Sequence, residues 1–406
     1  MYRSNEVGLY SETYSQRKTI NNILYIFSLF VFLIVAQNSD FSSNRIIWWG
    51  SVALLGVSFL TAYRGKMFFD SYAIWIGVFT FISFASVLWA IIPDLVLSNI
   101  KSMIVQVVAL LIIKSSVRNQ KDIEFVLKLL LFACLINSVY LILTNISVLT
   151  QQTEEFGDRL GANENWNANS IGIMTSVSSI IALYFLKISP KKSVKFFYAA
   201  AIAFLIFVSL ITGSRKAVVI LMGGMAAYIF ASSKGKRIRA VFLIALIIIL
   251  LWYVVMEVPY FYSVIGWRIE AFLSQYTGEG ELDNSASTRQ VLIEAAIDAW
   301  RKSPVFGHGL DCFRYFGRLA TGKDYYAHNN FVELLADLGI VGFVSYYAGY
   351  LYVLVKSWKN RANSLSLLFF IMICVMLVTE YACVTYADFL FGVIIVLMFS
   401  CAKLKN

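Results

Sequence analysis

Residues 241–255 read VFLIALIIILLWYVV, and residues 196–214 read FFYAAAIAFLIFVSLITGS. Neither run contains a charged residue. In hydrocarbon every backbone polar group must find its hydrogen-bond partner inside the protein, so only helices and closed barrels span a bilayer. The two runs are continuous and not alternating, which predicts helices and not the strands of a barrel.

The composition of the whole chain also indicates a membrane protein. Of the 406 residues, 59% are hydrophobic and 14% are charged, whereas a soluble domain has about 25% charged residues. A large soluble core does not explain this, because single cores stop growing near ~250–300 residues. We therefore predict an all-α membrane bundle whose solvent is the lipid bilayer. The net charge of +10 is explained by its distribution along the connections, and no nucleic-acid partner is expected.

Apolar runs of about 20 residues predict twelve membrane-spanning helices. The predicted spans are 21–37, 46–63, 67–92, 95–113, 123–149, 168–187, 196–212, 217–232, 240–257, 331–357, 364–379 and 387–402. Nine spans lie within residues 1–257, a long connection covers 258–330, and three spans lie within 331–406. No cleaved signal peptide is predicted, because the first apolar run ends without a small-residue cleavage pattern.

Basic residues alternate between successive connections. The basic connections and chain ends hold, among others, Arg3, Lys18, Arg64, Lys114, Lys191, Lys236, Lys359 and Lys403. The opposite short connections hold only Arg45, Arg159, Arg215 and Lys216. The positive-inside rule places the basic set, and therefore both ends of the chain, in the cytoplasm.

Residues 258–330 form the long connection, which this orientation places outside the cytoplasm. A connection of this length is usually either functional or disordered. Ser287-Thr288-Arg289-Gln290 predicts a capping box that opens a helix. Leu292, Ala296, Ala299 and Trp300 then form one apolar stripe at helical spacing. With a second helix expected over residues 262–276 along the membrane surface, we predict a folded loop that carries short helices.

The turn Thr212-Gly213-Ser214-Arg215-Lys216 joins two spans on the outer side, where its two cations oppose the insertion bias. Charge near the membrane is costly and is usually functional or paired. Ser214 is a candidate N-cap, which places Arg215 in the first turn of the next helix. The backbone N–H groups there, the helix dipole and a guanidinium suit a phosphate. The alternative is a pair of interfacial charges that reach to lipid headgroups.

A second candidate lies in the stretch Tyr325-Tyr326-Ala327-His328-Asn329-Asn330. Asn330 and Glu333 have capping-box spacing, which predicts that the tenth span begins here. His328 then lies just above a helix N-terminus, whose dipole disfavours the imidazolium. Such a histidine tends to be neutral at pH 7 and can accept a proton. The alternative is a helix-entry histidine that only hydrogen-bonds to backbone.

Three further cations are candidates. Arg289 lies at the start of the helix predicted in the outer loop. Arg159 precedes several asparagines and Trp166, residue types that suit a sugar or form ordinary turns. Lys101 lies about two turns into the fourth span, from where it reaches either an outer cavity or the lipid headgroups.

The cysteines and histidines indicate little further chemistry. Five cysteines show no CxxC spacing. Cys312 and Cys383 both fall outside the cytoplasm, where a disulfide and two free thiols are the alternatives. With only His308 and His328 in the chain, a zinc site built on imidazoles is not expected. We predict no metal and no cofactor.

Taken together, these motifs resemble the O-antigen ligase and O-antigen polymerase superfamily of bacterial envelope glycosyltransferases. The resemblance rests on Thr212-Gly213-Ser214-Arg215, on Ser287-x-Arg289 followed by Trp300, Pro304, Gly307 and Gly309, and on His328-Asn329-x-x-x-Glu333 before Leu338-Gly339-x-x-Gly342. It covers roughly residues 155–355, and the first four spans match only in topology. His308 departs from the small apolar residue that is usual between the two glycines.

The resemblance implies a metal-independent transfer of a glycan from undecaprenyl diphosphate to an acceptor-sugar hydroxyl, at the outer face of the bacterial cytoplasmic (inner) membrane. It implies that Arg215 and Arg289 hold the diphosphate and that His328 activates the acceptor. Weaker donor contacts are assigned to Arg159 and Lys101, and weaker substrate contacts to Tyr325, Tyr326, Asn329 and Glu333. The expected partners are the undecaprenyl-diphosphate-linked glycan, the acceptor glycan, the lipid bilayer and a chain-length regulator protein.

Ligases and polymerases share this chemistry and differ in the acceptor, which is a lipid A core or another lipid-linked repeat unit. The basic Gly-Ser-Arg-Lys turn favours a polymerase of O-antigen or capsule. The alternative of another class is a flippase that transports lipid-linked oligosaccharides. Transporters are expected to have repeats and midplane charges or broken helices, whereas the polar residues here concentrate near the outer surface.

Overall fold

Each predicted span overlaps a helix in the computed structural model, which describes residues 22–63, 69–147, 158–162, 166–277 and 284–404. Twelve apolar helices carry the bundle: α2 (Ile23–Ala36), α4 (Arg45–Tyr63), α5 (Ser71–Ala85), α6 (Pro93–Ser116), α7 (Gln120–Thr144), α9 (Ala168–Ile188), α10 (Lys192–Ile211), α11 (Arg215–Ser232), α12 (Arg237–Glu257), α17 (Asn330–Lys359), α18 (Ser364–Glu380) and α19 (Phe389–Ala402). The described part of the chain has no β-strand, only an isolated bridge between Ala162 and Asn167. The predicted helical membrane bundle is confirmed.

Length separates these helices into two groups. Within the described ranges, nine helices are long and apolar enough to cross a membrane, counting α5 together with the 3₁₀ turn Ser86–Leu88 that continues it. The other three, α2, α18 and α19, have 14, 17 and 14 residues. At 1.5 Å per residue, 14 residues extend about 21 Å, less than the ~30 Å hydrocarbon thickness. The count of twelve complete spans therefore stays a prediction.

The tenth predicted span is broken, contrary to its prediction as one continuous helix. Gly339 in α17 has φ 61° and ψ −164°, outside the helical region. A Cβ atom at this position would lie 2.3 Å from the carbonyl oxygen of Val305, so only glycine fits. Beyond the break, the amides of Ile340 and Val341 donate to the carbonyls of Pro304 and Val305 at 2.9 and 3.2 Å. The Leu338-Gly339 motif thus fixes the long connection to α17.

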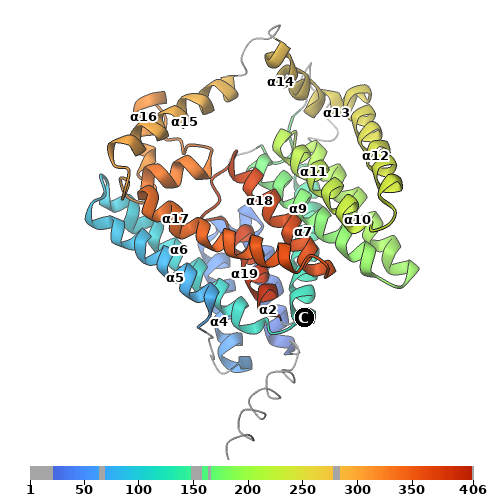
Figure 1. Cartoon of the computed structure of the whole chain (residues 1–406), viewed down its shortest axis with the longest axis horizontal. Coiled ribbons are helices and arrows are strands. Elements are labelled where there is room, and N and C mark those ends of the chain that lie inside the picture. The colour runs from blue at the N-terminus through green and yellow to red at the C-terminus, as the bar shows by residue number, and fades with distance from the viewer. Residues whose placement is uncertain (1–21, 64–68, 148–157, 163–165, 278–283, 405–406) are drawn as a thin grey trace, which may run out of the picture.

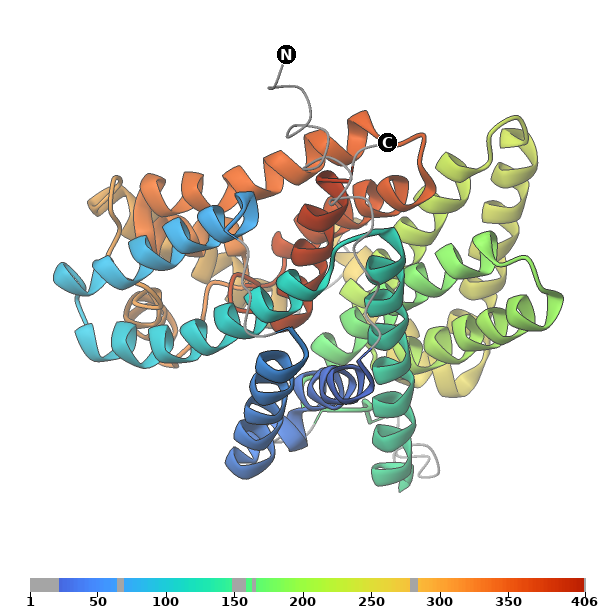
Figure 2. The same cartoon turned by 90° about the horizontal axis from the view of Figure 1, so that it is seen from below.

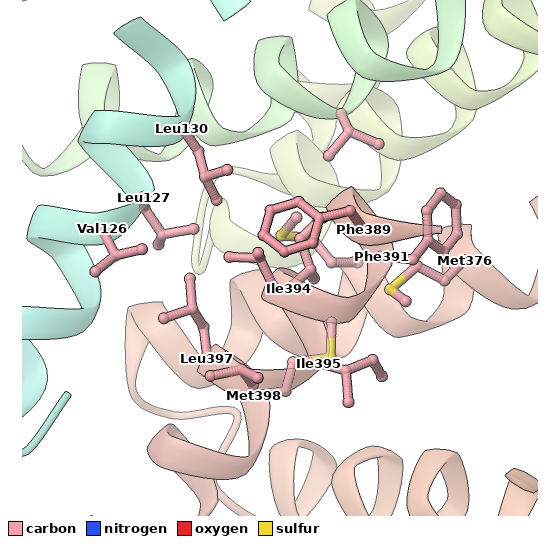
Figure 3. Close-up of a cluster of buried hydrophobic side chains, with 14 of the residues drawn as sticks. Val126, Leu127, Leu130, Met376, Phe389, Phe391, Ile394, Ile395, Leu397 and Met398 are labelled. Atoms are coloured by element: carbon pink, nitrogen blue, oxygen red, sulfur yellow. The ribbon is translucent and has the colours of Figure 1, made fainter. Parts of the chain in front are cut away.

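The core of the bundle lies around α19 and α9. Figure 2 shows α18 and α19 between the α9–α11 side and the α5–α6 side. Nearly every residue of α19 is buried, and Figure 3 shows Leu127 and Leu130 of α7 near Phe389 and Ile394 of α19. By contrast, the most apolar 18-residue stretch of α12 has a mean hydropathy of 2.8, and only 11% of that stretch is buried. Such an apolar outer surface suits lipid and not water.

The described residues of the long connection form helices in two parts (Figure 1). The first part, α13 (Pro259–Phe261), a π-helical turn (Tyr262–Gly266) and α14 (Trp267–Thr277), lies beside α12. The second part, α15 (Asn284–Lys302) and α16 (Phe313–Thr321), packs on α17. One detail was wrong: α15 begins at Asn284, so Ser287 is inside the helix and not its cap.

The two ends of α19 mark two different environments. Asp388, its N-cap, lies at the end of the bundle that contains Lys216 and Tyr326. Lys403, its C-cap, pairs with Asp70 at 2.9 Å, and Asp70 also pairs with Lys114 at 2.7 Å. Helix ends that the charge pattern assigns to one side of the membrane therefore meet. Of the basic residues behind that pattern, Arg3, Lys18 and Arg64 lie outside the described residues.

Candidate active site

The turn between α10 and α11 is built as the sequence predicts. The Ser214 hydroxyl accepts a hydrogen bond from the amide of Ala217 at 3.4 Å and caps α11. Gly213 has φ 59°, and a Cβ there would lie 2.8 Å from the carbonyl oxygen of Val264. The short side chains thus allow α9, α11 and the outer loop to approach one another, which brings Arg215 to the surface between them.

Arg159 is fixed to the same turn. Its Nε donates to the carbonyl of Thr212 at 2.8 Å, and its Nη2 lies 3.4 Å from Oδ1 of Asn169. The Ser214 hydroxyl donates to the same Asn169 oxygen at 3.0 Å. The amide of Leu160 adds a backbone bond to Ile211 at 3.0 Å. Arg159 is therefore a rigid part of the turn, although it lies 53 residues from it in sequence.

Four arginines from separate segments form one group, which we call the arginine cluster: Arg159, Arg215, Arg268 and Arg289. Burial, followed by the charges of Arg268, Arg215 and Arg289, lowers the pKa of Arg159 to about 10. Arg159 still keeps its charge at neutral pH. The guanidinium carbon of Arg215 lies 5.4 Å from the ring centroid of Phe272 in α14. The sequence analysis predicted three of these arginines, Arg159, Arg215 and Arg289, as site residues, and the structure brings them together.

Arg268 was missed by the sequence analysis. Its only signal was that it is the single basic residue in the helix expected over residues 262–276. The sequence pattern does not show against which part of the protein α14 packs. Lys101, in contrast, was predicted to contact the donor, but it is exposed on α6, and no described contact joins it to the arginine cluster.

Several of these cations have no carboxylate partner. Among the described residues, no Asp or Glu forms an ion pair with Arg159, Arg289 or Lys216. The amine of Lys216 instead donates to the carbonyl of Ala382 and lies 3.2 Å from the sulfur of Cys383. Cys383 and Cys312 are both free thiols, so the disulfide alternative is excluded in this structure. The site therefore carries a concentrated positive charge.

His328 lies beside this charge. Its backbone is in the left-handed region, with φ 57°, a conformation that is uncommon outside glycine and frequent at functional sites. Burial first, and then the charges of Arg289 and Lys216, lower its pKa to about 4. The imidazole is thus neutral at pH 7, as predicted, and burial and the nearby cations are causes that the sequence did not reveal. Within the described structure its Nδ1 is buried and has no hydrogen-bond partner.

Most residues around His328 make contacts that hold its segment of the chain in place. The Tyr326 ring lies 4.1 Å from the imidazole, centroid to centroid, and burial raises the pKa of Tyr326 to about 12. Asn329, not Asn330, caps α17, accepting from the amides of Phe331 and Val332 at 2.9 and 3.3 Å.

Two more of the weaker substrate candidates have structural contacts. Glu333 is buried and accepts from the amide of Ala327 at 2.5 Å, which fixes the segment that bears His328. Tyr325 packs in the small apolar cluster of α15 and α16. Its ring centroid lies 6.3 Å from that of His328, so Tyr326, at 4.1 Å, is the nearer of the two tyrosines to the imidazole.

Other polar groups serve the architecture. Asp337 accepts from the amides of Asp311 and Phe313 at 2.8 and 2.7 Å. The His308 Nε2 lies 2.8 Å from the carbonyl of Ala299 and so ties the loop to α15. No group of three His, Cys, Asp or Glu side chains that could hold a metal occurs among the described residues.

Fold and site together define a multi-pass helical membrane protein with a cationic site and a neutral histidine at one end of its bundle. Residues 199–347, from α10 into α17, match the family described as O-antigen ligase. The match confirms the resemblance to the O-antigen ligase and polymerase superfamily and indicates activity of that kind. Arg215, Arg268, Arg289 and His328 fall inside the matched region, whereas Arg159 precedes it. Comparison with curated proteins gives no match.

Proposed function

We propose that this protein is a membrane glycosyltransferase that polymerises lipid-linked repeat units of an O-antigen or a capsule. It transfers a glycan from undecaprenyl diphosphate to a hydroxyl of an acceptor sugar, at the outer face of the bacterial cytoplasmic membrane. The observation that carries this proposal is the arginine cluster beside a neutral, partly buried histidine. The first part suits an anionic leaving group, and the second suits a hydroxyl nucleophile.

The arginines stabilise the leaving diphosphate. As the bond between the anomeric carbon and the diphosphate oxygen breaks, negative charge grows on the diphosphate, and preorganised cations lower the energy of that state. Arginine is suited to this role because its planar guanidinium donates to two phosphate oxygens at once. Arg215 and Arg289 hold the diphosphate and Arg159 supports them from its fixed place beside Thr212. Because these arginines supply the positive charge that stabilises the diphosphate, we propose that the reaction is metal-independent.

His328 activates the acceptor. A general base must be unprotonated and within hydrogen-bond reach of the proton that it removes. With a pKa of about 4, His328 is unprotonated, and its Nδ1 has no partner among the described residues. The acceptor oxygen bonds to the anomeric carbon and its proton moves to the imidazole. The diphosphate oxygen leaves with the bonding electron pair, which produces undecaprenyl diphosphate.

A ligase is the second candidate. The matching family is described as O-antigen ligase, and the same donor site would serve transfer to a lipid A core. The discriminating experiment uses the purified protein in nanodiscs with lipid-linked repeat units, with and without lipid A core. A polymerase produces a ladder of longer lipid-linked glycans from repeat units alone. A ligase produces a glycan-bearing core only when the core is present. A flippase produces neither, and that result would overturn the proposal.

The proposed orientation can be tested separately. A membrane-impermeant thiol reagent should label a cysteine at Asp158, near the arginine cluster, in intact cells. Cysteines at Lys191, Lys236 and Lys359 should be labelled only after the membrane is opened, because the positive-inside rule places them in the cytoplasm. Labelling of the Asp158 position only after opening would place the site on the wrong side for an extracytoplasmic polymerase. The predicted label at Gly278 lies outside the described residues.

A further inference from the structure

A small polar cavity lies next to His328. It has a volume of about 80 Å³ and lies where the N-terminal ends of α9, α11 and α19 meet the loop that bears Tyr326. Its polar lining includes Asn167, Asn169, Ser170, Lys216, Tyr326 and Asp388. A volume of this size is more than one water molecule needs. It is also close to the proposed base, because the ring centroid of Tyr326 lies 4.1 Å from that of His328.

Residues that line the cavity contact both the proposed base and the arginine cluster. Asn169, which lines it, is also the residue that accepts from Arg159 at 3.4 Å and from Ser214 at 3.0 Å. Lys216, on the same wall, acts electrostatically on His328. A molecule in this cavity would therefore lie near side chains that contact the proposed base and near one that contacts the arginine cluster.

A second cavity of about 200 Å³ continues the first. Asn167, Ser170 and Asp388 line both cavities, so the two meet at these residues. The larger cavity adds Trp166 and, from the end of α2, Gln37. Within the described structure, both side-chain amide atoms of Gln37 are buried without a hydrogen-bond partner. An unsatisfied buried amide is destabilising, and a ligand in the cavity would satisfy it.

We propose that the two cavities form the binding groove for the acceptor glycan. The smaller cavity holds the sugar that carries the attacking hydroxyl, and the larger cavity holds the next sugar of the chain. This inference rests on the proposed glycosyl transfer and adds the acceptor site to it.

The chemistry of the lining selects a sugar over the diphosphate. Hydroxyl groups both donate and accept hydrogen bonds, and the groove offers both kinds of partner. Lys216 and the amide N–H groups of Asn169 and Gln37 donate, while the carboxylate of Asp388 accepts. Asp388 would repel a phosphate, whereas the arginine cluster would bind one. Trp166 supplies the flat apolar surface that completes a pocket of this kind.

Ser170 offers a way to close the groove without removing a contact. It lines both cavities, and only its backbone amide takes part in a described hydrogen bond, to the α9 cap Asn167 at 3.4 Å. Ser170→Trp keeps that amide and fills the junction. Ser102→Trp, at an exposed position of α6, is the matched control. Gln37→Leu removes the unpartnered amide at nearly constant volume, with Gln120→Leu as control, since Gln120 bonds only to Glu124 on the exposed start of α7.

The test uses Cys383, a free thiol that lines the smaller cavity. Its rate of modification by a maleimide is measured by peptide mass spectrometry on the full-length protein in nanodiscs. The added probe is the lipid-free repeat-unit oligosaccharide, prepared by depolymerising the surface polysaccharide of the cells, or inorganic diphosphate. We expect the oligosaccharide to slow labelling about tenfold in the wild type, and inorganic diphosphate to leave the rate unchanged. Ser170→Trp should lose the protection, and Ser102→Trp should keep it.

The Gln37→Leu variant keeps the test decisive if Ser170→Trp does not fold. It should need about tenfold more oligosaccharide for the same protection, the effect of losing one or two hydrogen bonds, and Gln120→Leu should behave as wild type. Unchanged labelling with the oligosaccharide, or equal protection in Gln37→Leu and wild type, would overturn the acceptor groove. Normal protection without any glycan transfer would instead overturn the proposed function and leave the groove as a glycan-binding site.

Discussion

The two ends of α19 differ in whether the cations near them have carboxylate partners. At its C-terminal end, Lys403 and Lys114 both pair with Asp70, at 2.9 and 2.7 Å, and the side chains of Lys114 and Asp70 are each only 7% exposed. At its N-terminal end, Arg159, Arg289 and Lys216 lie together with no carboxylate partner among the described residues. Ion pairs thus hold the helices together at one end, whereas the cations at the other end can bind an anionic ligand.

The difference has a physical cause. A buried charge needs a partner, because removing one partner of a buried ion pair costs about 3–5 kcal/mol. Asp70 meets this need for two lysines and also caps α5, accepting from the amides of Tyr72 and Ala73. At the other end, burial first, and then the charges of neighbouring arginines, lower the pKa of Arg159 to about 10. Polar and ionisable groups kept at such an expense are usually functional.

The largest effect is expected for His328→Asn. Asparagine tolerates the left-handed backbone at this position, but it cannot take up the acceptor proton. We expect a loss of about 10²–10⁴ in transfer rate, the usual range for general base catalysis, with donor binding preserved. The measurement is initial-rate polymer formation in nanodiscs. The control is His308→Gln, which keeps a donor for the carbonyl of Ala299. A rate for His328→Asn equal to wild type would exclude the base.

A slightly smaller effect is expected for Arg289→Ala. This arginine acts on Arg159, Tyr326 and His328 together, and loss of one preorganised charge donor costs about 10²–10³-fold in rate. Arg215→Lys should also be impaired, because lysine keeps the charge but loses the planar fork. Lys101→Ala is the control and should stay within about twofold of wild type, the behaviour of most surface substitutions. Equal losses in Lys101→Ala and Arg289→Ala would contradict the assignment of the cluster.

The pH dependence should change in Lys216→Met. A general base acts when unprotonated, so the wild-type rate should fall only as the pH decreases through about 4, the pKa of His328. Removing the Lys216 charge raises this pKa toward its ordinary value of 6.5, without reaching it, because burial is the larger cause. The acid limb of the rate at saturating substrate should therefore move to higher pH. An acid limb that stays in place would contradict the electrostatic link between Lys216 and His328.

The smallest effect on transfer is expected for Asp70→Asn. This change leaves Lys114 and Lys403 without their carboxylate, so stability should fall by about 3–5 kcal/mol, read as a lower denaturation midpoint in detergent. The rate per folded molecule should stay near wild type, because the pair lies at the far end of α19 from His328. If Asp70→Asn reduced the transfer rate without reducing stability, the two ends would not have separate roles.

Much of this fold follows from hydrophobicity and charge along the chain. Runs such as residues 241–255 have no soluble alternative, so the helices that they form could be predicted to within a few residues. The break at Gly339 could not, because it depends on the approach of Val305 from the long connection. The predicted start of α15 was wrong: the capping-box pattern placed it at Ser287, whereas the helix begins at Asn284.

The candidate site was predicted in part. Arg215 and His328 gave local signals, an N-capped turn and a helix entry, and the structure has both near the predicted form. Arg268 gave none, since only the fold of α14 brings it to Arg159. Lys101 was assigned to the donor from its depth in the membrane alone, and no described contact supports that assignment. The polar cavities, too, are assembled from helix ends distant in sequence, which no local pattern reveals.

The most direct test of the central claim is the affinity of undecaprenyl diphosphate for the purified protein in nanodiscs, measured by calorimetry. The wild type and Asp70→Asn should bind it equally, because the ion pairs of Asp70 only hold helices together. Arg289→Ala should bind it at least about tenfold more weakly, the effect of losing one charge-assisted contact of roughly 1.5–3 kcal/mol. Equal affinity in Arg289→Ala and wild type would contradict the claim that the cations without carboxylate partners form the diphosphate site.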